Sequence, residues 1–361
     1  MRRLIVSDPR NGDRIFPYIG GEEVNDSPTH AYHRYVINFE DFPLRRKETG
    51  HSWFGLTEKT QKEQLREGVV APDYPKPVAA DWPDLLAIVE ERVKPERLKL
   101  SDDFGRLYWW RFMRARPELK RAIASMPNVL VIPRVSQYAT SALIEAKLVF
   151  SDQLVVCALS TMSSFAILQS QVHELWARFM ASTLEDRLRY TPSDCFETFP
   201  FPLAFETNSN VECTGRAYYE FRSELMLRRN EGLTKTYKKF HDRSNVTSDI
   251  DELRRLRAVM DRAVLDAYGW LDIQSMCDFF PESDEEEEAE DQTRKKERFR
   301  YRWPDNVRDD VLARLLSLNQ LRYEEEALAG LHDRADGTRR TRRKSDSDQA
   351  EAYDDQGELD L

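Results

Sequence analysis

The sequence predicts an α+β fold: a mixed α/β core, a mainly helical C-terminal domain and a disordered tail. Short β-branched segments lie between residues 128 and 159, and apolar residues recur at helical spacing from residue 165 onward. Such runs favour strands, whereas steps of three and four favour helices. Residues 331–361 have almost no apolar content. A segment of that kind cannot bury a core, so we expect the tail to be disordered.

Residues 1–100 are predicted to be an irregular segment that leads into the core, because they are rich in Pro, Gly and aromatic side chains. A strand-like run lies at 35–39, and a long polar loop is expected over 48–78. A helix is expected to begin near Pro83, since Pro is tolerated in the first helical turn.

Residues 101–205 form the predicted α/β core. An arginine-rich helix around Trp109 leads to strands at 128–132, 141–144 and 154–159, and a helix follows over 165–179. His173 lies on that last helix and is expected to be a packing residue. The large side chains expected to be buried are Trp109, Trp110, Phe165, Trp176, Phe199 and Phe201.

Residues 206–330 are predicted to be a helical domain with helices over 216–229, 248–268 and 305–329. Gly269 is a suitable stop for the second of them. Between the second and third helices, blocks of opposite charge predict a solvated acidic loop over 282–298.

The charge is unevenly distributed. The formal net charge is -10, yet residues 1–205 carry equal numbers of acidic and basic side chains, so all the excess acid follows residue 205. Between 104 and 150 only Glu118 and Glu145 oppose a basic group made of Arg106, Arg111, Arg114, Arg116, Lys120, Arg121, Arg134 and Lys147. The net negative charge of the whole chain argues against a protein that binds nucleic acid non-specifically. A local basic surface that contacts phosphates remains possible. The alternative is a solvated helix face.

Catalytic and metal motifs are absent from the sequence. It has no GxGxxG, P-loop, GxSxG or HExxH motif, and its four cysteines have no CxxC spacing, so we expect neither a metal site nor catalytic residues. Glu145 and Lys147 match the ExK half of a metal-dependent nuclease, but the usual preceding Asp is missing, which favours an edge-strand charge pair. No apolar run is long enough for a membrane span, and the N-terminus has too short an apolar run for a signal peptide. We therefore expect a cytoplasmic protein.

A polar loop follows the strand at 128–132 directly. Residue type makes Arg134 and Gln137 candidates for base or backbone reading, because Arg pairs with guanine and Gln with adenine. Tyr138 is a candidate for stacking or for bonding phosphate. Local charge makes four further residues candidate phosphate contacts: Arg111, Arg114, Arg116 and Lys147.

Several segments, in this order, resemble a known family: 16–23 (FPYIGGEE), 128–135 (NVLVIPRV), 150–156 (FSDQLVV), 168–177 (LQSQVHELWA), 193–202 (SDCFETFPFP), 230–237 (NEGLTKTY) and 265–270 (LDAYGW). They are similar to the C-terminal, target-recognition part of type IIG-like restriction–modification enzymes, which are single-chain adenine-specific DNA methyltransferases. The resemblance spans roughly residues 5–330 and implies that the α/β core is a target-recognition domain.

The sequence departs from that family at its catalytic motifs. Members carry a Gly-rich loop for S-adenosylmethionine and an Asn/Asp-Pro-Pro-Tyr/Phe motif that holds the flipped adenine. This chain contains no Pro-Pro dipeptide, and residues 8–12 (DPRNG) lack the glycine spacing of the cofactor loop. No catalytic residue of the family carries over, so we expect no cofactor in this chain and S-adenosylmethionine in a catalytic partner.

The resemblance implies sequence-specific recognition of double-stranded DNA for an N6-adenine methyltransferase of a restriction–modification or phage-defence system. The chain is then a split subunit or a truncated form, inactive alone, whose partners are DNA and a methyltransferase catalytic subunit or domain. The alternative is a protein-interaction scaffold of the same system without its own DNA readout.

Overall fold

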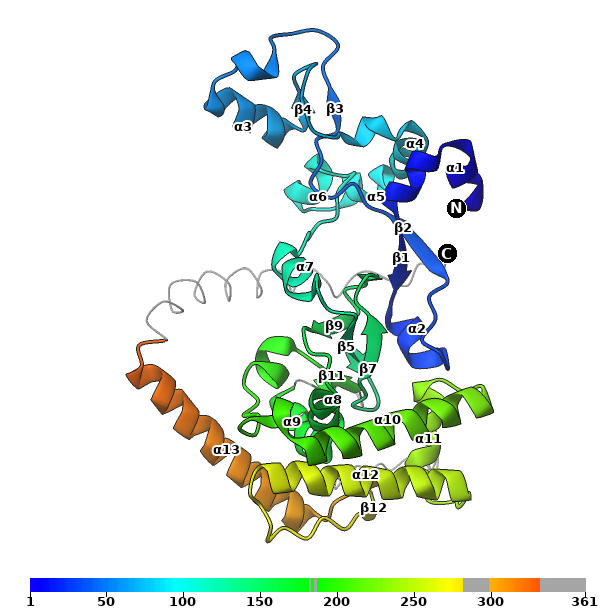
Figure 1. Ribbon diagram of the computed structural model, residues 1–361, viewed down its shortest axis with the longest axis vertical. Helices are drawn as coiled ribbons and strands as arrows, with labels where there is room; N and C mark the ends of the chain where they lie inside the picture. The colour runs from blue at the N-terminus through cyan, green and yellow to red at the C-terminus, as the bar shows by residue number, and fades with distance from the viewer. Residues whose placement is uncertain (182, 185–186, 282–298, 332–361) are drawn as a thin grey trace, which may run out of the picture.

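The computed structural model describes residues 1–181, 183–184, 187–281 and 299–331. Helices and strands are mixed in it, which confirms the predicted α+β class. The acidic loop expected over 282–298 and the tail expected over 331–361 lie outside the described residues, apart from residue 331. Figure 1 shows an elongated molecule with the N-terminal elements at one end and the long C-terminal helices at the other.

The N-terminal part has a hydrophobic core of its own, in which Phe39, Trp82, Leu85, Trp109 and Trp110 are buried. Trp82 and Trp110 also donate their indole N–H groups to backbone carbonyls, so these rings are hydrogen-bonded as well as packed. The elements before residue 108 are α1 (Arg2–Ser7), β1 (Ile15–Ile19), α2 (Gly21–Asp26), β2 (Arg34–Ile37), β3 (Arg45–Arg46), α3 (Glu58–Glu67), β4 (Val69–Val70), α4 (Pro83–Arg92), α5 (Lys94–Lys99) and α6 (Asp103–Leu107).

Two local predictions for this region are wrong. The stretch 48–78, expected to be a loop, contains α3 and β4, because Thr57 caps the helix at the Thr60 N–H and Gly68 ends it at a φ of 74°. The helix expected around Trp109 is absent, since α6 ends at Leu107. The next helix, α7 (Pro117–Ile123), begins at a proline, which is well tolerated in the first helical turn.

The centre of the molecule is a three-stranded antiparallel sheet with the order β7-β5-β9. Five of the six β5 residues are buried, as expected for a β-branched central strand. The three strands expected from the sequence are confirmed to within a few residues. The strands of this region are β5 (Asn128–Pro133), β6 (Val135–Ser136), β7 (Ala142–Glu145), β8 (Val149–Phe150), β9 (Leu154–Cys157), β10 (Thr183–Leu184) and β11 (Arg187–Arg189).

The single helix expected over 165–179 is two helices, α8 (Met162–Gln169) and α9 (Gln171–Met180). Ser170 separates them with an extended backbone, and its hydroxyl accepts a hydrogen bond from the His173 N–H. A serine in this position offers the backbone an alternative to helix continuation, which the apolar stripe alone does not reveal. Phe165 and Trp176 are buried as predicted.

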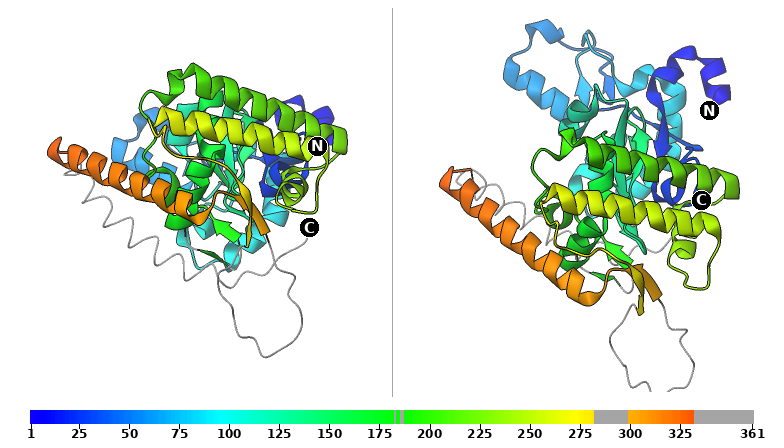
Figure 2. Two further views of the ribbon diagram at one scale, coloured as in Figure 1. Left: turned by 90° about the horizontal axis from the view of Figure 1, so that it is seen from below. Right: turned by 60° about the horizontal axis from the view of Figure 1, so that its bottom comes forward.

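The helical part packs directly on this core. Its elements are α10 (Ser209–Arg229), α11 (Leu233–Phe240), α12 (Ser248–Ala267), the hairpin strands β12 (Asp278–Pro281) and β13 (Phe299–Arg302), and α13 (Asp305–Leu328). Gly215 lets α10 approach α8 closely, since a Cβ atom there would lie 2.4 Å from the Met162 carbonyl oxygen. Both views of Figure 2 show α10 and α12 side by side, with α13 projecting outward.

One hydrophobic core joins the sheet and the helices. It includes Val131 of β5, Phe165 of α8, Leu225 of α10, Val264 of α12 and Leu315 of α13. The core therefore continues across residue 205, and helices far along the chain are able to support the loops of the sheet. Among the helices of the described residues, none combines the length and the apolarity needed to cross a membrane.

Candidate nucleic-acid interface

The polar loop after β5 begins with an exposed arginine on a fixed backbone. The Arg134 N–H donates to the Gln153 carbonyl at 2.8 Å, and the Arg134 carbonyl accepts from the Tyr190 N–H at 2.8 Å. The side chain of Arg134 is exposed. A guanidinium on an anchored backbone suits recognition, because little conformational freedom is lost on contact.

The next two predicted residues are held by contacts within the protein, Gln137 through its backbone carbonyl and Tyr138 through its ring. The Gln137 carbonyl accepts from Arg178 and Arg300, each at 3.2 Å. Tyr138 is 8% exposed, and its ring stacks on His241 with centroids 5.1 Å apart and an interplanar angle of 12°. The Tyr138 ring therefore packs in the interior of the protein, and this position does not suit the stacking or phosphate contact expected for it.

Arg111 is also held inside the protein. Its Nε donates to the Phe42 carbonyl at 2.9 Å, and its guanidinium lies over the rings of Tyr108 and Trp110. Burial lowers the pKa of Arg111. These contacts assign it to the aromatic core of the N-terminal part.

The remaining predicted residues, Arg114, Arg116 and Lys147, are exposed. Lys147 lies in the turn after β7, where the Ala146 N–H donates to the Pro127 carbonyl just before β5 begins. Arg116 directly precedes α7. Because Ala146 lies opposite Pro127, seven residues before Arg134, Lys147 and Arg134 are ~23 Å apart along the strand at the usual rise per residue. The predicted set thus falls into two groups.

Two arginines that the sequence analysis missed lie on β11, the strand that pairs with the segment beginning at Arg134. Arg187 and Arg189 are exposed on β11, while Leu188 between them is buried. β11 pairs with β6 so that Arg189 lies opposite Val135, and extending the register by one residue brings Arg187 opposite Gln137. The alternation Arg-Leu-Arg-Tyr was the available signal for this short strand. We call Arg134, Arg187 and Arg189 the β6–β11 arginine patch.

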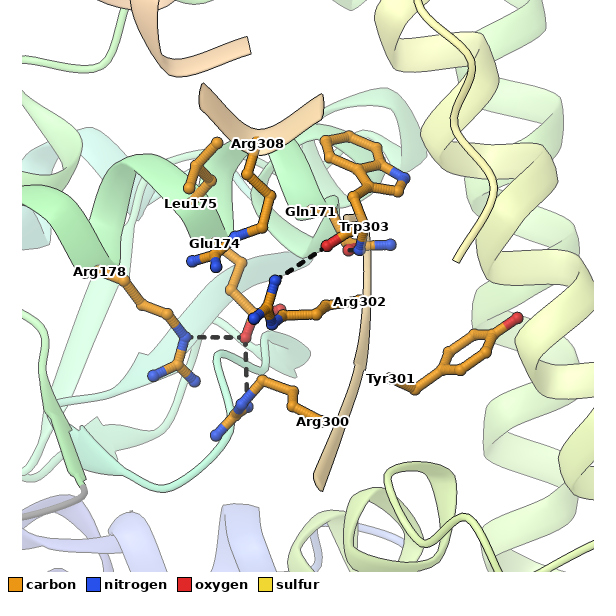
Figure 3. A pocket seen from close by; sticks show the side chains of 9 residues that line it. All are labelled: Gln171, Glu174, Leu175, Arg178, Arg300, Tyr301, Arg302, Trp303 and Arg308. Carbon is orange, nitrogen blue, oxygen red and sulfur yellow. Dashed lines mark hydrogen bonds and ion pairs between the residues drawn. The ribbon is translucent and has the colours of Figure 1, made fainter. Parts of the chain in front are cut away.

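The two arginines that bond the Gln137 carbonyl also contact a largely buried carboxylate, which is surrounded by arginines. Glu174 of α9 is 3.1 Å from Arg178 Nε, 3.4 Å from Arg300 Nη1 and 3.5 Å from Arg257 Nη2. Figure 3 shows Arg178 and Arg300 converging on it from α9 and β13. The adjoining cavity has a volume of about 30 Å³, roughly the space of one water molecule. This cluster is a structural joint between the sheet and the C-terminal part.

The Glu174 carboxyl is expected to make stability fall in acid. Burial by itself would raise its pKa, but the three guanidinium groups outweigh burial and hold the pKa at about 2, below the usual 4.5. Stability from this group is therefore present above about pH 4.5 and is lost as the pH falls toward 2, by ~3 kcal/mol in all. Urea unfolding of the wild type and Glu174→Gln between about pH 3 and 7 measures this effect. The difference between the two proteins should shrink in acid, and a constant difference would contradict the assignment.

His173 is confirmed as a packing residue. It is 1% exposed, and its imidazole is hydrogen-bonded to the Leu168 carbonyl at 3.1 Å and to the Tyr190 hydroxyl at 3.1 Å. Burial lowers the pKa of the His173 imidazole to about 4. Because Tyr190 directly follows β11, His173 helps to hold the strand that carries Arg187 and Arg189.

Comparison with known proteins gives one family match. Residues 90–203 match the family model described as "MmeI, target recognition domain". This range contains all three members of the β6–β11 arginine patch, and also Glu174 and Arg178. No curated protein matches the chain.

Among solved structures, the chain is similar to the Type IIL restriction-modification enzyme MmeI in complex with DNA, with 18% sequence identity and a TM-score of 0.49. The match covers 88% of this chain and 32% of that chain, so this chain spans about a third of the enzyme's length. The resemblance expected from the sequence, to the target-recognition part of restriction–modification enzymes, is confirmed by the family match over residues 90–203.

Proposed function

We propose that this chain recognises a short sequence in double-stranded DNA as the target-recognition half of a restriction–modification methyltransferase. The observation that carries the proposal is the match of residues 90–203 to a target recognition domain, within which Arg134, Arg187 and Arg189 are exposed on paired segments of the chain. Phosphate contacts fix the register of a protein on the duplex, and base-edge contacts choose the sequence.

Within the patch we assign different roles. Arg134 and the neighbouring Gln137 side chain are the proposed base readers, each good bidentate pair being worth about 1–3 kcal/mol of discrimination. Arg187 and Arg189 are the proposed phosphate contacts. Lys147 is proposed to contact phosphates farther along the duplex, because the length of β5 separates it from Arg134. Arg114 and Arg116, which are exposed before α7, are proposed as further phosphate contacts.

The catalytic activity belongs to a partner in this proposal. The chain contains neither the glycine-rich loop nor the Pro-Pro motif that would hold S-adenosylmethionine and the target adenine, so we derive no methyl-transfer step for it. We propose an adenine-specific methyltransferase subunit or domain as the partner, acting in the cytoplasm in phage defence. The two parts need each other in this proposal. The catalytic part must extrude the target base from the stack, which costs a few kcal/mol, and it acts at one sequence because the recognition part holds the duplex in register.

Selection from random duplexes tests the proposal. The purified chain is mixed with a pool of random double-stranded DNA at two salt concentrations, and the bound fraction is sequenced. We expect enrichment of one short motif and a steep loss of affinity with salt, because bound phosphates release counterions. Arg134→Ala should flatten the motif. A folded chain that enriches no motif and shows no salt dependence would contradict the proposal and favour the scaffold alternative.

The scaffold alternative has one observation in its favour. The end of α13 projects from the body, with Leu321 53% exposed and Leu328 90% exposed. Exposed leucines on a projecting helix suit a protein partner. A scaffold of this kind binds its partner at this helix and does not select a DNA sequence.

A further inference from the structure

The loop after β5 is held by side chains from distant parts of the chain. We propose that Arg178 and Arg300, oriented by Glu174, are positioning residues that set the loop for base reading. The inference rests on the proposed function. It states that Arg178 and Arg300 fix the conformation of the loop, so that Arg134 and Gln137 are correctly oriented toward the DNA bases. Neither arginine was selected by the sequence analysis, and neither belongs to the β6–β11 arginine patch.

The first support is a carbonyl that accepts two charged donors. Arg178 Nη2 and Arg300 Nη2 both lie 3.2 Å from the Gln137 carbonyl oxygen. The donors come from α9 and β13, the latter 163 residues away from Gln137 in sequence. Hydrogen bonds from charged donors are stronger than neutral ones, so this carbonyl has little freedom to move.

The second support is the carboxylate that orients both donors. Glu174 Oε1 is 3.1 Å from Arg178 Nε and 3.4 Å from Arg300 Nη1 (Figure 3). Each guanidinium therefore bridges this carboxylate and the Gln137 carbonyl. The side chains of Arg300 and Glu174 are only 8% and 15% exposed. A guanidinium held by two acceptors in a buried site keeps one orientation, which is what a preorganised recognition loop requires.

The third support is that the rest of the loop is anchored in the same way. Tyr138 is stacked on His241, whose Nδ1 accepts the Tyr301 N–H, and the Arg300 guanidinium lies 5.5 Å from the Tyr138 ring centroid. Gln169 then bonds the Ala139 carbonyl and the Ser141 N–H at 3.1 and 2.9 Å. The backbone from 137 to 141 is therefore clamped by α8, α9 and β13, directly after the exposed Arg134.

The test uses the variants Arg178→Lys and Arg300→Lys. Lysine keeps the positive charge, but its single ammonium group cannot bridge the Glu174 carboxylate and the Gln137 carbonyl as a guanidinium does. The control is Arg302→Lys, because Arg302 lines the same cavity but bonds Asp305 and the Trp303 carbonyl, not the loop. For each protein we compare affinity for the selected duplex with affinity for a scrambled duplex. We expect this ratio to fall about 10-fold in the two test variants and to stay unchanged in the control.

A second measurement reports on the order of the loop in the absence of DNA. Amide hydrogen exchange of residues 134–141 in the free protein should be faster in Arg178→Lys and Arg300→Lys than in the wild type and Arg302→Lys. Unchanged exchange in folded test variants would overturn the positioning role. Faster exchange with an unchanged selectivity ratio would overturn the link to base reading. If the wild type itself selects no sequence, the proposed function fails, and the exchange result alone then decides whether the arginines order the loop.

Discussion

Replacing Glu174 by glutamine is expected to lower the free energy of unfolding by about 3–5 kcal/mol, the usual cost of removing one partner from a buried ion pair. The variant leaves Arg178, Arg257 and Arg300 charged around a neutral amide, and the Arg257 and Arg300 side chains are only 5% and 8% exposed. Arg257 keeps its ion pair with Asp261, but the amide no longer neutralises the guanidinium groups of Arg178 and Arg300, so the net positive charge of the cluster rises. Urea unfolding followed by tryptophan fluorescence measures the change.

The control for this variant is Glu252→Gln. Glu252 lies on the exposed face of α12 and pairs with Arg255 in water, where ion pairs contribute little to stability. The urea midpoint should therefore not move. Equal effects of the two substitutions would show that the Glu174 cluster has no special place in the structure.

Replacing Arg187 and Arg189 together by alanine is expected to cause the largest loss of DNA binding. Both side chains are exposed on β11 beside the loop after β5, so their removal should leave the fold intact. If each contacts one phosphate, the slope of log affinity against log salt becomes shallower by about 2, and affinity at low salt falls at least ~10-fold. Titration of a fluorescent duplex at several salt concentrations measures both quantities.

The matched control is the double variant Lys59→Ala, Lys62→Ala. It removes the same two positive charges from the exposed surface of α3, at the opposite end of the molecule from α10 and α12 (Figure 1). We expect a much smaller change in salt slope. A control that loses as much affinity as the β11 variant would mean that net charge, and not the β6–β11 arginine patch, governs binding.

Local patterns in the sequence were enough for the strands of the central sheet and for the long helices α12 and α13. The β-branched run at 128–132 became β5, and the apolar stripes at 248–268 and 305–329 became α12 and α13 to within one residue at each end. The predicted burial of Trp109, Trp110, Phe165 and Trp176 is also confirmed. Such features follow from side-chain size and periodicity, which do not depend on distant parts of the chain.

Other elements depend on single capping residues, which hydrophobic periodicity and overall polarity do not reveal. The Ser170 hydroxyl splits a continuous apolar stripe into two helices, and Thr57 and Gly68 make a helix from a polar stretch. Capping contributes only about 1 kcal/mol, so it is decisive where helix and loop are nearly balanced and is hard to weigh beforehand.

The sequence by itself determined the α+β class, the resemblance to target-recognition parts and the presence of many arginines around the central strands. Only the tertiary structure decided which arginines do what. The guanidinium of Arg111 packs against aromatic rings, and Arg187 and Arg189 are exposed at the surface. Arg300 bonds the carbonyl of Gln137, a residue 163 positions earlier in the sequence. The physical reason is that a guanidinium has the same chemistry wherever it occurs. Its role is set by burial and by acceptors that long-range packing places around it.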